Sequence, residues 1–447
     1  MILFLLSLAS AEPLMMRVEK GQTAPFDGRL FNDEAVASIL ADSESVIQQC
    51  EIRKDLEWKT QMAEEINGRG TSILRGYQKG DTEARKSWVK EYAGIDIDDT
   101  LEDETEDLQG IIENHVGFMK VPMAVVGPMI IDGKYAKGEF CVPLCTLEGT
   151  LAMSMNRGIY ASALSGGIKV NHFRQELSRA PVFIFDNLKE SSDFQAWVSE
   201  NESKIKKVAE STTNHGKVLR IDQYTVQNYV ILDLVLDTSN AAGQNMVTLA
   251  AKVACEYIQK ETNHNYFLES NLNSDKKASV RNMILGRGHG VTAETTIKNS
   301  VMKRILKIDP DILFDAWSFF PIVSSMAGTH GNGLHVSNAL TAIYLATGQD
   351  AACAAENSVA HFGIEKREDA LKFKLTLPSL TVGTVGGGTR LKMQNKNLEL
   401  LRCSEGKNSS RKLAEIIAGA TLSLEISLIC AIGSHTWTDA HMKYGRK

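Results

Sequence analysis

The chain has 447 residues, of which 43% are hydrophobic and 23% charged, and a formal net charge of -6. These values are typical of a soluble globular protein, and the length predicts two domains with appendages. A nucleic-acid-binding protein would need a basic stripe, and the sequence has none, so we expect no nucleic-acid partner. Seven cysteines without a CxxC pair argue against a disulfide framework or a structural zinc site, which favours a reducing compartment such as the cytoplasm.

Residues 1–50 form an N-terminal extension with a helix expected over residues 33–50. The start, MILFLLSLASA, has an apolar run and an Ala-x-Ala ending like a short signal peptide, but it lacks a positively charged beginning. Export and a simple apolar start therefore both stay open. No stretch reaches the roughly 20 uncharged apolar residues of a membrane span. The nearest stretch, residues 416–432, carries Glu425, so we expect no membrane span.

Residues 51–110 have the pattern of a charged helical region followed by an acidic linker. The segment 96–107, DIDDTLEDETED, holds eight acids and no base. A solvated linker or exposed face is the simpler interpretation, and an interaction tail is the alternative.

From residue 111 short apolar runs are interrupted by prolines and by an Asp132-Gly133 turn, which predicts strands and a hairpin leading to Glu148. Small residues then follow from Ala152 to Ala163, and they predict a helix packed tightly against another backbone. Glu148 lies where β-type residues give way to this helix, and such termini commonly carry chemistry.

A small compact unit is predicted next, from 182 to 268. Its pattern is a strand at 182–185, an amphipathic helix over 193–210, a strand near Val218, the strand YVILDLVLD, a helix opened by Gly243 and a last strand at 266–268. That helix carries Met246, Leu249, Val253 and Tyr257. In YVILDLVLD the alternate Val and Leu residues share one face, and Asp233 and Asp237 lie opposite. The order β-α-β-β-α-β predicts a ferredoxin-like fold.

The remainder, 269–447, returns to the larger domain. Helix-like runs at 293–306, 337–346 and 410–432 alternate with glycine-rich turns such as GRGHG, GTHGNG and GTVGGGT.

Isolated polar residues in apolar or glycine-rich settings suggest a site. They are Asp275-Lys276-Lys277, Gln349-Asp350, His435 and His441, and our hypothesis is that they converge on Glu148. Two carboxylates such as Glu148 and Asp350 would be costly to bury without a cation, and a lysine between them would polarise a carbonyl oxygen. The alternatives are an ordinary surface loop for the triplet and a surface residue for His441.

The segment DTSNAAGQNM joins a strand to a helix through small residues, so backbone N-H groups at the helix start are available to a phosphate. GTVGGGT would allow a cofactor to approach the backbone closely. Neither segment matches GxGxxG after a first strand, so a Rossmann site is not supported, and a structural turn is the alternative for each.

Several longer motifs occur in one order: ENHVGF, VPLCTLEGTLAMSMNRG, GQNMVT, SDKK, GRG, SSMAG, HVSNALTAIYLATGQDAA and SH-x5-HM. On these motifs the chain resembles the hydroxymethylglutaryl-CoA reductase family over roughly residues 50–447. The resemblance implies an α+β fold, with a large, mainly helical CoA-binding domain (111–175 and 269–447) and an inserted ferredoxin-like dinucleotide-binding domain (176–268). It also implies NADPH-dependent reduction of (S)-3-hydroxy-3-methylglutaryl-CoA to mevalonate, with NADH possible, in a homodimer or tetramer with shared active sites.

The resemblance also assigns site residues. The catalytic set is Glu148, Lys276 and Asp350, with His441 as the general acid for the departing CoA thiolate. CoA contacts match Ser154, Asn156 and Arg157, and the hydroxymethylglutaryl pocket matches Asn271, Asp275, Lys277 and Asn338. The dinucleotide side matches Asn240, Ala241, Ala242, Gly243, Gln244, Asn245, Met246, Gly445 and Arg446.

The chain also departs from the family pattern. Asn240 stands where the family motif GDAMGMN has aspartate, and Phe319 where the family has a lysine that pairs with the substrate carboxylate. Asn171 stands where the family commonly has arginine, with the neighbouring Lys169 as an alternative cation. The loop expected at the adenosine 2'-phosphate, STTNHGK, offers only Lys217 and His215 as cations. A reductase of a different branched acyl-CoA and a non-catalytic CoA-binding paralogue therefore stay as alternatives.

Overall fold

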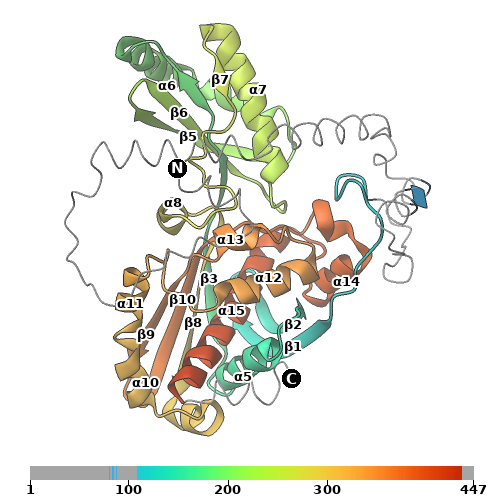
Figure 1. The fold of residues 1–447 in the computed structure, drawn as a ribbon, viewed down its shortest axis with the longest axis vertical. Helices are drawn as coiled ribbons and strands as arrows, with labels where there is room; N and C mark the ends of the chain where they lie inside the picture. Colours follow the sequence, from blue (N-terminus) through green and yellow to red (C-terminus); the bar gives the residue numbers. More distant parts are fainter. Residues whose placement is uncertain (1–79, 81–82, 85–86, 88–107, 435–447) are drawn as a thin grey trace, which may run out of the picture. The chain divides into compact units, whose positions relative to one another are not determined.

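The computed structural model describes residues 80, 83–84, 87 and 108–434, which lie in one compact unit, Gly76–Lys447 (Figure 1). Several predictions fall outside the described residues: the signal-like start, the helix at 33–50, nearly all of the charged helical region, the acidic segment, His435, His441, Gly445 and Arg446.

The described part contains a ten-stranded sheet, flanked by helices, so the α+β class is confirmed. The main path of the sheet runs β7-β4-β6-β3-β8-β10-β9, with β5 beside β6 and the β1-β2 hairpin beside β3. The strands are β1 (Met123–Asp132), β2 (Lys137–Cys145), β3 (Ile168–Arg179), β4 (Val182–Ile184), β5 (Lys217–Val226), β6 (Tyr229–Asp237), β7 (Tyr266–Phe267), β8 (Gly288–Lys298), β9 (His361–Lys366) and β10 (Ala370–Leu380). The principal helices are α5 (Leu151–Ala163), α6 (Leu188–Glu210), α7 (Gln244–Thr262), α8 (Val280–Ile284), α10 (Pro310–Trp317), α11 (Phe320–Met326), α12 (Val336–Thr347), α13 (Cys353–Asn357), α14 (Lys392–Leu400) and α15 (Ser409–Gly433).

The predicted hairpin before Glu148 is present as β1 and β2, and it turns at Gly133, whose N-H donates to the carbonyl of Ala136 at 2.9 Å. The predicted small-residue helix is α5, and it packs against α15. A Cβ atom at Gly158 would lie 1.9 Å from the carbonyl oxygen of Ser423, so only glycine permits this approach. The small residues of α5 therefore allow close packing against another backbone, as predicted.

Helix α15 forms the centre of the larger hydrophobic cluster and contacts α5, α12, β3, β8 and β10 (Figure 1). It is the one helix of the described residues that is long and apolar enough to cross a membrane by length and composition, but 89% of its apolar window is buried inside the protein. Glu425, near its middle, is buried too and accepts the backbone N-H groups of Leu334 and His335. The helix is thus built into the core.

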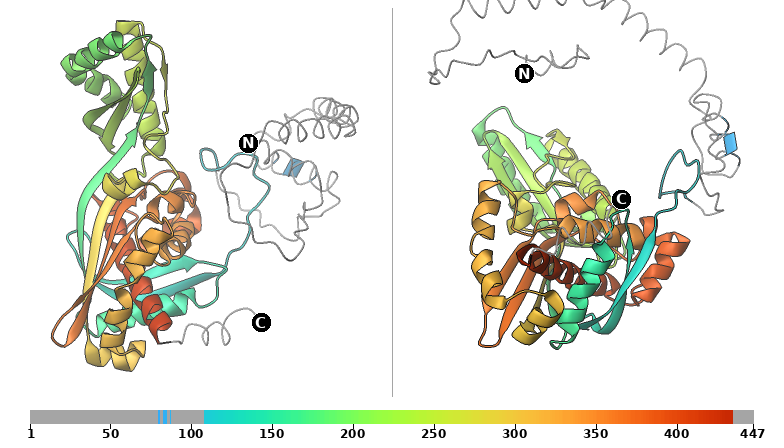
Figure 2. Two further views of the ribbon diagram at one scale, coloured as in Figure 1. Left: turned by 60° about the vertical axis from the view of Figure 1, so that its left-hand side comes forward. Right: turned by 60° about the horizontal axis from the view of Figure 1, so that its bottom comes forward.

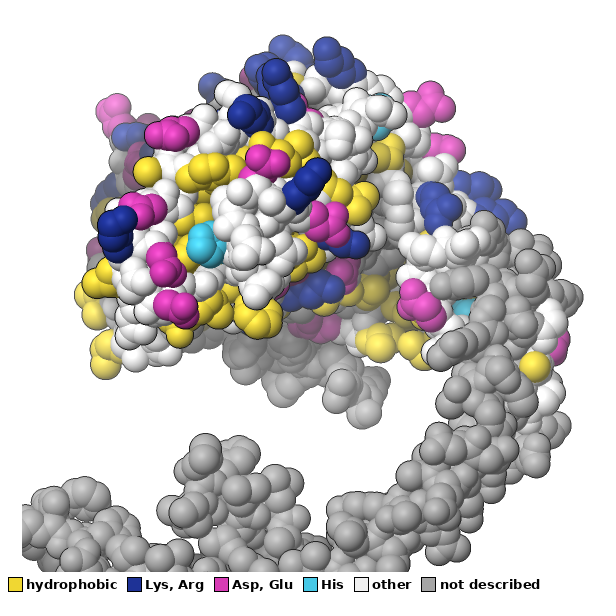
Figure 3. Space-filling model, turned by 90° about the horizontal axis from the view of Figure 1, so that it is seen from above, with side chains coloured by type: hydrophobic (Ala, Val, Ile, Leu, Met, Phe, Trp, Pro, Cys, Tyr) yellow, Lys and Arg dark blue, Asp and Glu magenta, His cyan; other side chains and the backbone are white. Residues whose placement is uncertain are grey.

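The ferredoxin-like pattern is confirmed in the second hydrophobic cluster, which spans Leu177 to Ile258. The four strands lie in the order β7-β4-β6-β5, all antiparallel, with α6 and α7 packed on them. Strand β3 links the two clusters, because it pairs with β8 along most of its length and with β6 at its last residues (Figure 2). On the end face drawn in Figure 3, charged side chains of both signs are interspersed among apolar ones.

Three details differ from the sequence analysis. Helix α6 starts earlier than predicted, at Leu188, because the Asn187 side chain caps it by accepting the N-H of Glu190. Residues 293–298 are strand and not helix, since Ala293, Thr295 and Ile297 are buried alternately in β8. Asp233 does lie opposite the leucines of β6, but it is buried, with Arg281 as its ion-pair partner.

Helix α7 packs on the sheet through smaller side chains than those noted in the sequence. Its buried face comprises Val247, Ala250, Ala251, Ala254, Cys255 and Ile258, while Leu249 is exposed. Alanines bring the helix close to the strands, and the longer apolar side chains lie at the margins of that face.

Candidate active site

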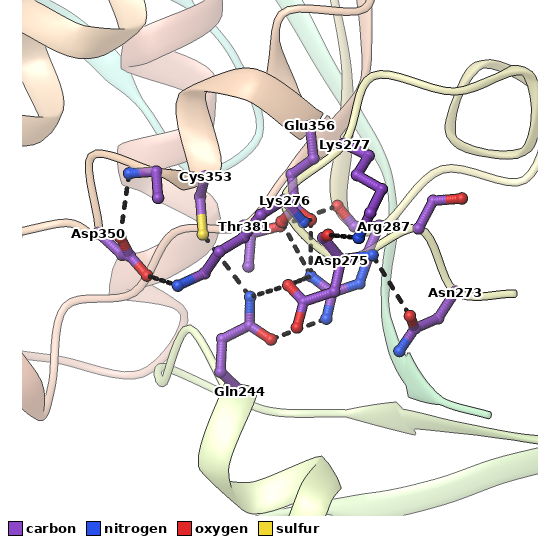
Figure 4. A network of polar contacts seen from close by, with 12 residues as sticks. Gln244, Asn273, Asp275, Lys276, Lys277, Arg287, Asp350, Cys353, Glu356 and Thr381 are labelled. Atoms are coloured by element: carbon purple, nitrogen blue, oxygen red, sulfur yellow. Dashed lines mark hydrogen bonds and ion pairs between the residues drawn. The ribbon is translucent and has the colours of Figure 1, made fainter. Parts of the chain in front are cut away.

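Lys276 and Asp350 form an ion pair, with 2.9 Å between Nζ and Oδ2 (Figure 4). Both side chains are about half exposed, at 48% and 47%. The hydrogen bond that the ammonium donates to Asp350 raises the pKa of Lys276 above its ordinary value. The ammonium group is therefore charged at neutral pH and open to a bound molecule.

Asp350 is held by the end of α12. Gly348 ends this helix with φ of 72°, and a Cβ atom there would lie 2.3 Å from the carbonyl oxygen of Gly388. The buried Gln349 side chain bonds both the N-H and the carbonyl of Gly383, each at 2.8 Å. The Asp350 carboxylate also accepts the N-H of Ala352. These contacts fix the backbone on both sides of the carboxylate.

Glu148 lies in the exposed turn between β2 and α5, where its N-H donates to the hydroxyl of Thr146 at 3.0 Å. Among the described residues no hydrogen bond or ion pair joins its carboxylate to Lys276 or Asp350. The predicted convergence is therefore seen directly for Lys276 with Asp350, and for Glu148 it stays a prediction.

Asp275 lies between two arginines. Its carboxylate is 3.4 Å from Arg179 and 3.5 Å from Arg287, and it accepts the side-chain amide of Gln244 at 3.2 Å. The neighbouring Lys277 is exposed and its ammonium donates to the backbone carbonyl of Asp275.

A buried ion pair, missed in the sequence analysis, lies behind the Lys276 loop. Arg287 and Glu356 are fully buried, 2.8 Å apart, and the Glu356 carboxylate also accepts the backbone N-H of Lys276 at 2.7 Å (Figure 4). The available signal was Glu356 itself, an acid directly after the apolar run AACAA (351–355), together with the arginine of GRG.

The predicted CoA contacts partly serve helix packing. Ser154 and Arg157 both bond Ser427 of α15, and Arg157 reaches its carbonyl oxygen at 2.6 Å. Burial lowers the pKa of Arg157 below its ordinary value. Asn156 is exposed and accepts the N-H of Gly127 at 3.0 Å.

The two asparagines assigned to the hydroxymethylglutaryl pocket lie in separate elements. Asn271 is exposed, has a φ of 68° and opens the Lys276 loop. Asn338 is half-buried in the first turn of α12.

The segment assigned to the dinucleotide turns into α7 at Gly243, which has φ of 91°. Helix α7 has no side-chain cap and no acid in its first turn. A Cβ atom at Gly383 would lie 2.2 Å from the N atom of Ala242, so the GTVGGGT segment passes directly beside this turn. The start of α7 is therefore the N-terminus of a long helix, and the N-H groups of its first turn are available to an anion.

Other residues of that segment have structural contacts. The Asn240 side chain donates to the carbonyl of Gly406 at 3.0 Å and accepts the N-H of Ser410. Ala241 pairs with Val385 in an isolated bridge. Asn245 is exposed, and Met246 packs against Gly216 of the STTNHGK loop.

Two departures from the family pattern, Phe319 and Asn171, are both at the surface. Phe319 is 50% exposed and stacks on Phe320 with 4.7 Å between ring centroids. Asn171 and Lys169 share the exposed face of β3.

Comparison with known proteins identifies the family. The model of the hydroxymethylglutaryl-coenzyme A reductase family matches residues 81–446. The 3-hydroxy-3-methylglutaryl-coenzyme A reductase of Aeropyrum pernix is 40% identical over 343 residues, covering 75% of this chain and 82% of the relative. That of Haloferax volcanii is 36% identical over 383 residues, covering 83% of this chain and 95% of the relative.

The fold is similar to that of the class II 3-hydroxy-3-methylglutaryl-CoA reductase from Streptococcus pneumoniae bound to NADPH in open conformations. The TM-score is 0.61 at 18% identity, over 78% of this chain and 96% of the other. Together with the family-model match and the archaeal relatives, these findings show that the chain belongs to the hydroxymethylglutaryl-coenzyme A reductase family.

Proposed function

We propose that the protein reduces (S)-3-hydroxy-3-methylglutaryl-CoA to mevalonate and CoA, as an oxidoreductase of the mevalonate pathway. The observation that carries this proposal is the half-exposed Lys276–Asp350 ion pair, in a chain that belongs to the reductase family. Reduction of a thioester to an alcohol requires two hydride transfers, and NADPH supplies both. We propose the cytoplasm as the location, because reduced nicotinamide is available there.

Lys276 is the proposed oxyanion stabiliser. A carbonyl oxygen becomes negative when hydride is added to its carbon, and a charged ammonium group at hydrogen-bond distance stabilises that charge. Asp350 holds the ammonium of Lys276 in place and raises its pKa, so the group stays charged. The same group serves the thioester step and the aldehyde step.

Glu148 and His441 are the proposed proton donors. His441 protonates the departing CoA thiolate, which would otherwise attack the aldehyde again, and imidazole is suited to this near neutral pH. Glu148 supplies the proton to the alcohol.

The start of α7 is the proposed dinucleotide phosphate site. Support comes from the N-H groups of its first turn, from the absence of an acid among its first-turn residues, and from the loop carrying Lys217 and His215, which lies against Met246. Gly445 and Arg446 complete this side in the proposal. With no arginine in STTNHGK, we expect the enzyme to discriminate NADPH from NADH weakly, so NADH stays possible.

We further propose that residues 176–268 hold the dinucleotide, and that 111–175 with 269–447 hold the CoA thioester. Ser154, Asn156 and Arg157 face the CoA, and Asn271, Asp275, Lys277 and Asn338 line the acyl pocket. The working form is a homodimer or tetramer with shared active sites. The apolar, unburied side chains of α11 support a second copy as the partner of that helix.

The test is nicotinamide oxidation by the full chain with hydroxymethylglutaryl-CoA, free mevaldehyde, and acyl-CoAs that lack the terminal carboxylate. The proposal expects both hydroxymethylglutaryl-CoA and mevaldehyde to be reduced, with formation of mevalonate. His441→Gln should slow the thioester substrate strongly and mevaldehyde much less. No turnover with any of these substrates would reject the reductase activity.

A different branched acyl-CoA is the second candidate, because Phe319 replaces the lysine expected at the substrate carboxylate and Asn171 replaces an arginine common in the family. An exposed phenylalanine at that position favours an apolar acyl end. A kcat/KM that is higher for a carboxylate-free acyl-CoA than for hydroxymethylglutaryl-CoA would select this candidate. A non-catalytic CoA-binding paralogue would bind CoA and oxidise no nicotinamide.

A further inference from the structure

The Lys276 backbone has a conformation that L-residues rarely adopt, with φ of 57°. A non-glycine residue persists in this strained region only when its surroundings hold it there. The holding contact is the bond from the Lys276 N-H to Oε2 of Glu356, 2.7 Å long. Since this N-H bond sets the direction of the lysine side chain, Glu356 influences where the ammonium group points.

Glu356 is itself fixed on both oxygens. Arg287 Nη1 donates to Oε1 at 2.8 Å and to Oε2 at 3.0 Å, and the Thr381 hydroxyl donates to Oε1 at 2.5 Å. Arg287 and Glu356 are fully buried, so water does not replace a lost partner. The carboxylate is therefore a rigid acceptor and not an adaptable one.

Gln244 joins this network from the other side. Its side-chain oxygen accepts Arg287 Nη2 at 2.7 Å, and its amide nitrogen donates to Asp275 and, at 3.6 Å, to the Cys353 sulfur (Figure 4). Gln244 is also the first residue of α7, the helix whose start we assign to the dinucleotide. One residue thus touches both the helix start and the partner of Glu356.

We propose that Glu356, Arg287 and Gln244 are positioning residues that connect the start of α7 to the aim of the Lys276 ammonium group. The inference rests on the proposed function, since it gives Lys276 and α7 their roles. In this arrangement the position of the Gln244 side chain responds to a cofactor bound at the start of α7. Gln244 in turn orients the Arg287 guanidinium, and the Arg287–Glu356 pair holds the Lys276 backbone. None of the three side chains contacts the reacting atoms.

The first test compares Glu356→Gln with Glu415→Gln. Glu415 is also a buried glutamate that accepts backbone N-H groups, those of Tyr135 and Ala136, and it contacts none of the proposed site residues. We expect Glu356→Gln to lower kcat by about 10- to 100-fold with KM for the acyl-CoA changed less than about threefold, because a small misplacement of a catalytic group has this effect. Glu415→Gln should leave both constants near those of the unsubstituted protein. Equal losses in the two variants would overturn the assignment.

The second test needs no turnover. Acetic anhydride modifies uncharged amines, and mass spectrometry of the peptides gives the rate at Lys276 relative to the exposed Lys252 of α7. In Glu356→Gln the Lys276 ammonium should separate from Asp350, and the pKa of Lys276 should therefore fall. The acetylation rate of Lys276 relative to Lys252 should then rise several-fold. Arg287→Lys, which keeps the charge but not the two-sided fork, serves if Glu356→Gln fails to fold. An unchanged rate in a folded variant rejects the positioning role, even if the protein reduces no acyl-CoA.

The third test addresses the link through Gln244. Gln244→Met keeps the length of the side chain and removes its hydrogen bonds to Arg287, Asp275 and Cys353. NADPH should change the Lys276 labelling rate by at least about twofold in the unsubstituted protein, and this response should be lost in Gln244→Met when each protein is saturated with NADPH, as judged by fluorescence titration. An equal response in both proteins, or none in the unsubstituted one, overturns the coupling. No turnover with a normal labelling response would instead reject the proposed function alone.

Discussion

The Lys276 ammonium depends on two acids with different tasks. Asp350 bonds the side chain and keeps it charged, whereas Glu356 bonds the backbone and fixes its direction. The first acid is half exposed and the second fully buried. The charge of the Lys276 side chain and the conformation of the Lys276 backbone are therefore controlled by different acids. The ammonium group stays accessible to a ligand while the backbone stays rigid.

Lys276→Ala should abolish reduction of both the thioester and mevaldehyde. One oxyanion site serves both steps, and the loss of one such donor lowers the rate by roughly 10²-fold or more. Because the side chain is about half exposed, the free energy of unfolding should change little. Steady-state nicotinamide oxidation with each substrate measures the effect, and substantial turnover by the variant would remove Lys276 from the mechanism.

Asn240→Asp should destabilise the protein although it matches the family motif. The Asn240 amide donates to the carbonyl of Gly406, so a carboxylate would place one oxygen against another. We expect the free energy of unfolding to fall by about 1–2 kcal/mol, whereas Asn214→Asp, at an exposed position, should change it by less than about 0.5 kcal/mol. Urea unfolding measures both values. Equal stability of Asn240→Asp and the unsubstituted protein would show that this bond is unimportant.

At the scale of elements, the contact of α5 with α15 permits no side chain at Gly158. Gly158→Ala would bring Cβ within 1.9 Å of the Ser423 carbonyl oxygen, and both helices would have to separate. We expect a loss of about 3 kcal/mol or more in the free energy of unfolding, at the upper end for overpacking. Gly363→Ala in β9 is the matched control, because nothing lies within 4 Å of its Cβ position. Similar unfolding midpoints for the two variants would contradict this packing argument.

The start of α12 is tied to α15 by Glu425, and this link should depend on pH. Burial raises the pKa of Glu425 from its ordinary 4.5 to about 7, against the opposing effect of two N-H donors. A carboxyl group with a raised pKa stabilises the fold fully below pH 4.5, and this contribution is lost as pH rises through 7. The loss amounts to about 3 kcal/mol.

Glu425→Gln has no proton to lose, so it lacks this pH dependence. Its stability relative to the unsubstituted protein should therefore rise between pH 4.5 and pH 7. Chemical denaturation of both proteins across that range measures the difference. If the free energies of unfolding of the two proteins differ by the same amount at every pH, Glu425 has an ordinary pKa in the folded state.

Sequence patterns predicted the elements whose residues interact locally. The hairpin before Glu148, the strand YVILDLVLD, α12 and α15 all carry their own periodicity or turn residues, and their positions are confirmed. The pattern failed at residues 293–298, where threonine and alanine fit a strand or a helix equally, and pairing with β3 and β10 decides. The Arg287–Glu356 ion pair was not predicted for a related reason, since the two residues are far apart in the chain.

The site shows the same division between local and distant information. The motifs singled out Lys276 and Asp350, and the structure places them in contact. The partners of Asp275, which are Arg179 and Arg287, depend on tertiary packing that no local pattern encodes. The contact between Lys276 and Asp350 was thus predictable, while the residues that surround the site were not.

At the scale of the whole molecule, β3 is the continuous element between the two hydrophobic clusters. It pairs with β8 of the larger cluster and ends on β6 of the ferredoxin-like cluster. Side chains provide further connections, among them Gln244 with Arg287, Asp233 with Arg281 and Asn240 with Gly406. A movement of the smaller part would have to bend β3 and strain these contacts, and the Gln244–Arg287 contact is the one at the helix start that we assign to the cofactor.

Helix α11 is the surface that the proposed second copy would cover. None of its residues is buried, and its apolar side chains Ile322, Val323 and Met326 are 63%, 52% and 82% exposed. Exposed apolar groups concentrated on one short helix are typical of a protein interface. Phe319, just before the helix, is 50% exposed and extends the same apolar surface.

Replacing Ile322 and Met326 together by lysine should therefore dissociate the proposed oligomer and lower the reductase activity in parallel, because in this proposal the partner completes each active site. Light scattering coupled to size exclusion gives the mass, and activity is followed over a dilution series. The matched control is Val226→Lys, which places a lysine on another exposed apolar residue, in the β5–β6 hairpin of the smaller cluster. It should change neither mass nor activity. A variant that is monomeric yet fully active would show that each chain holds a complete site, and an unchanged mass would assign the interface to another surface.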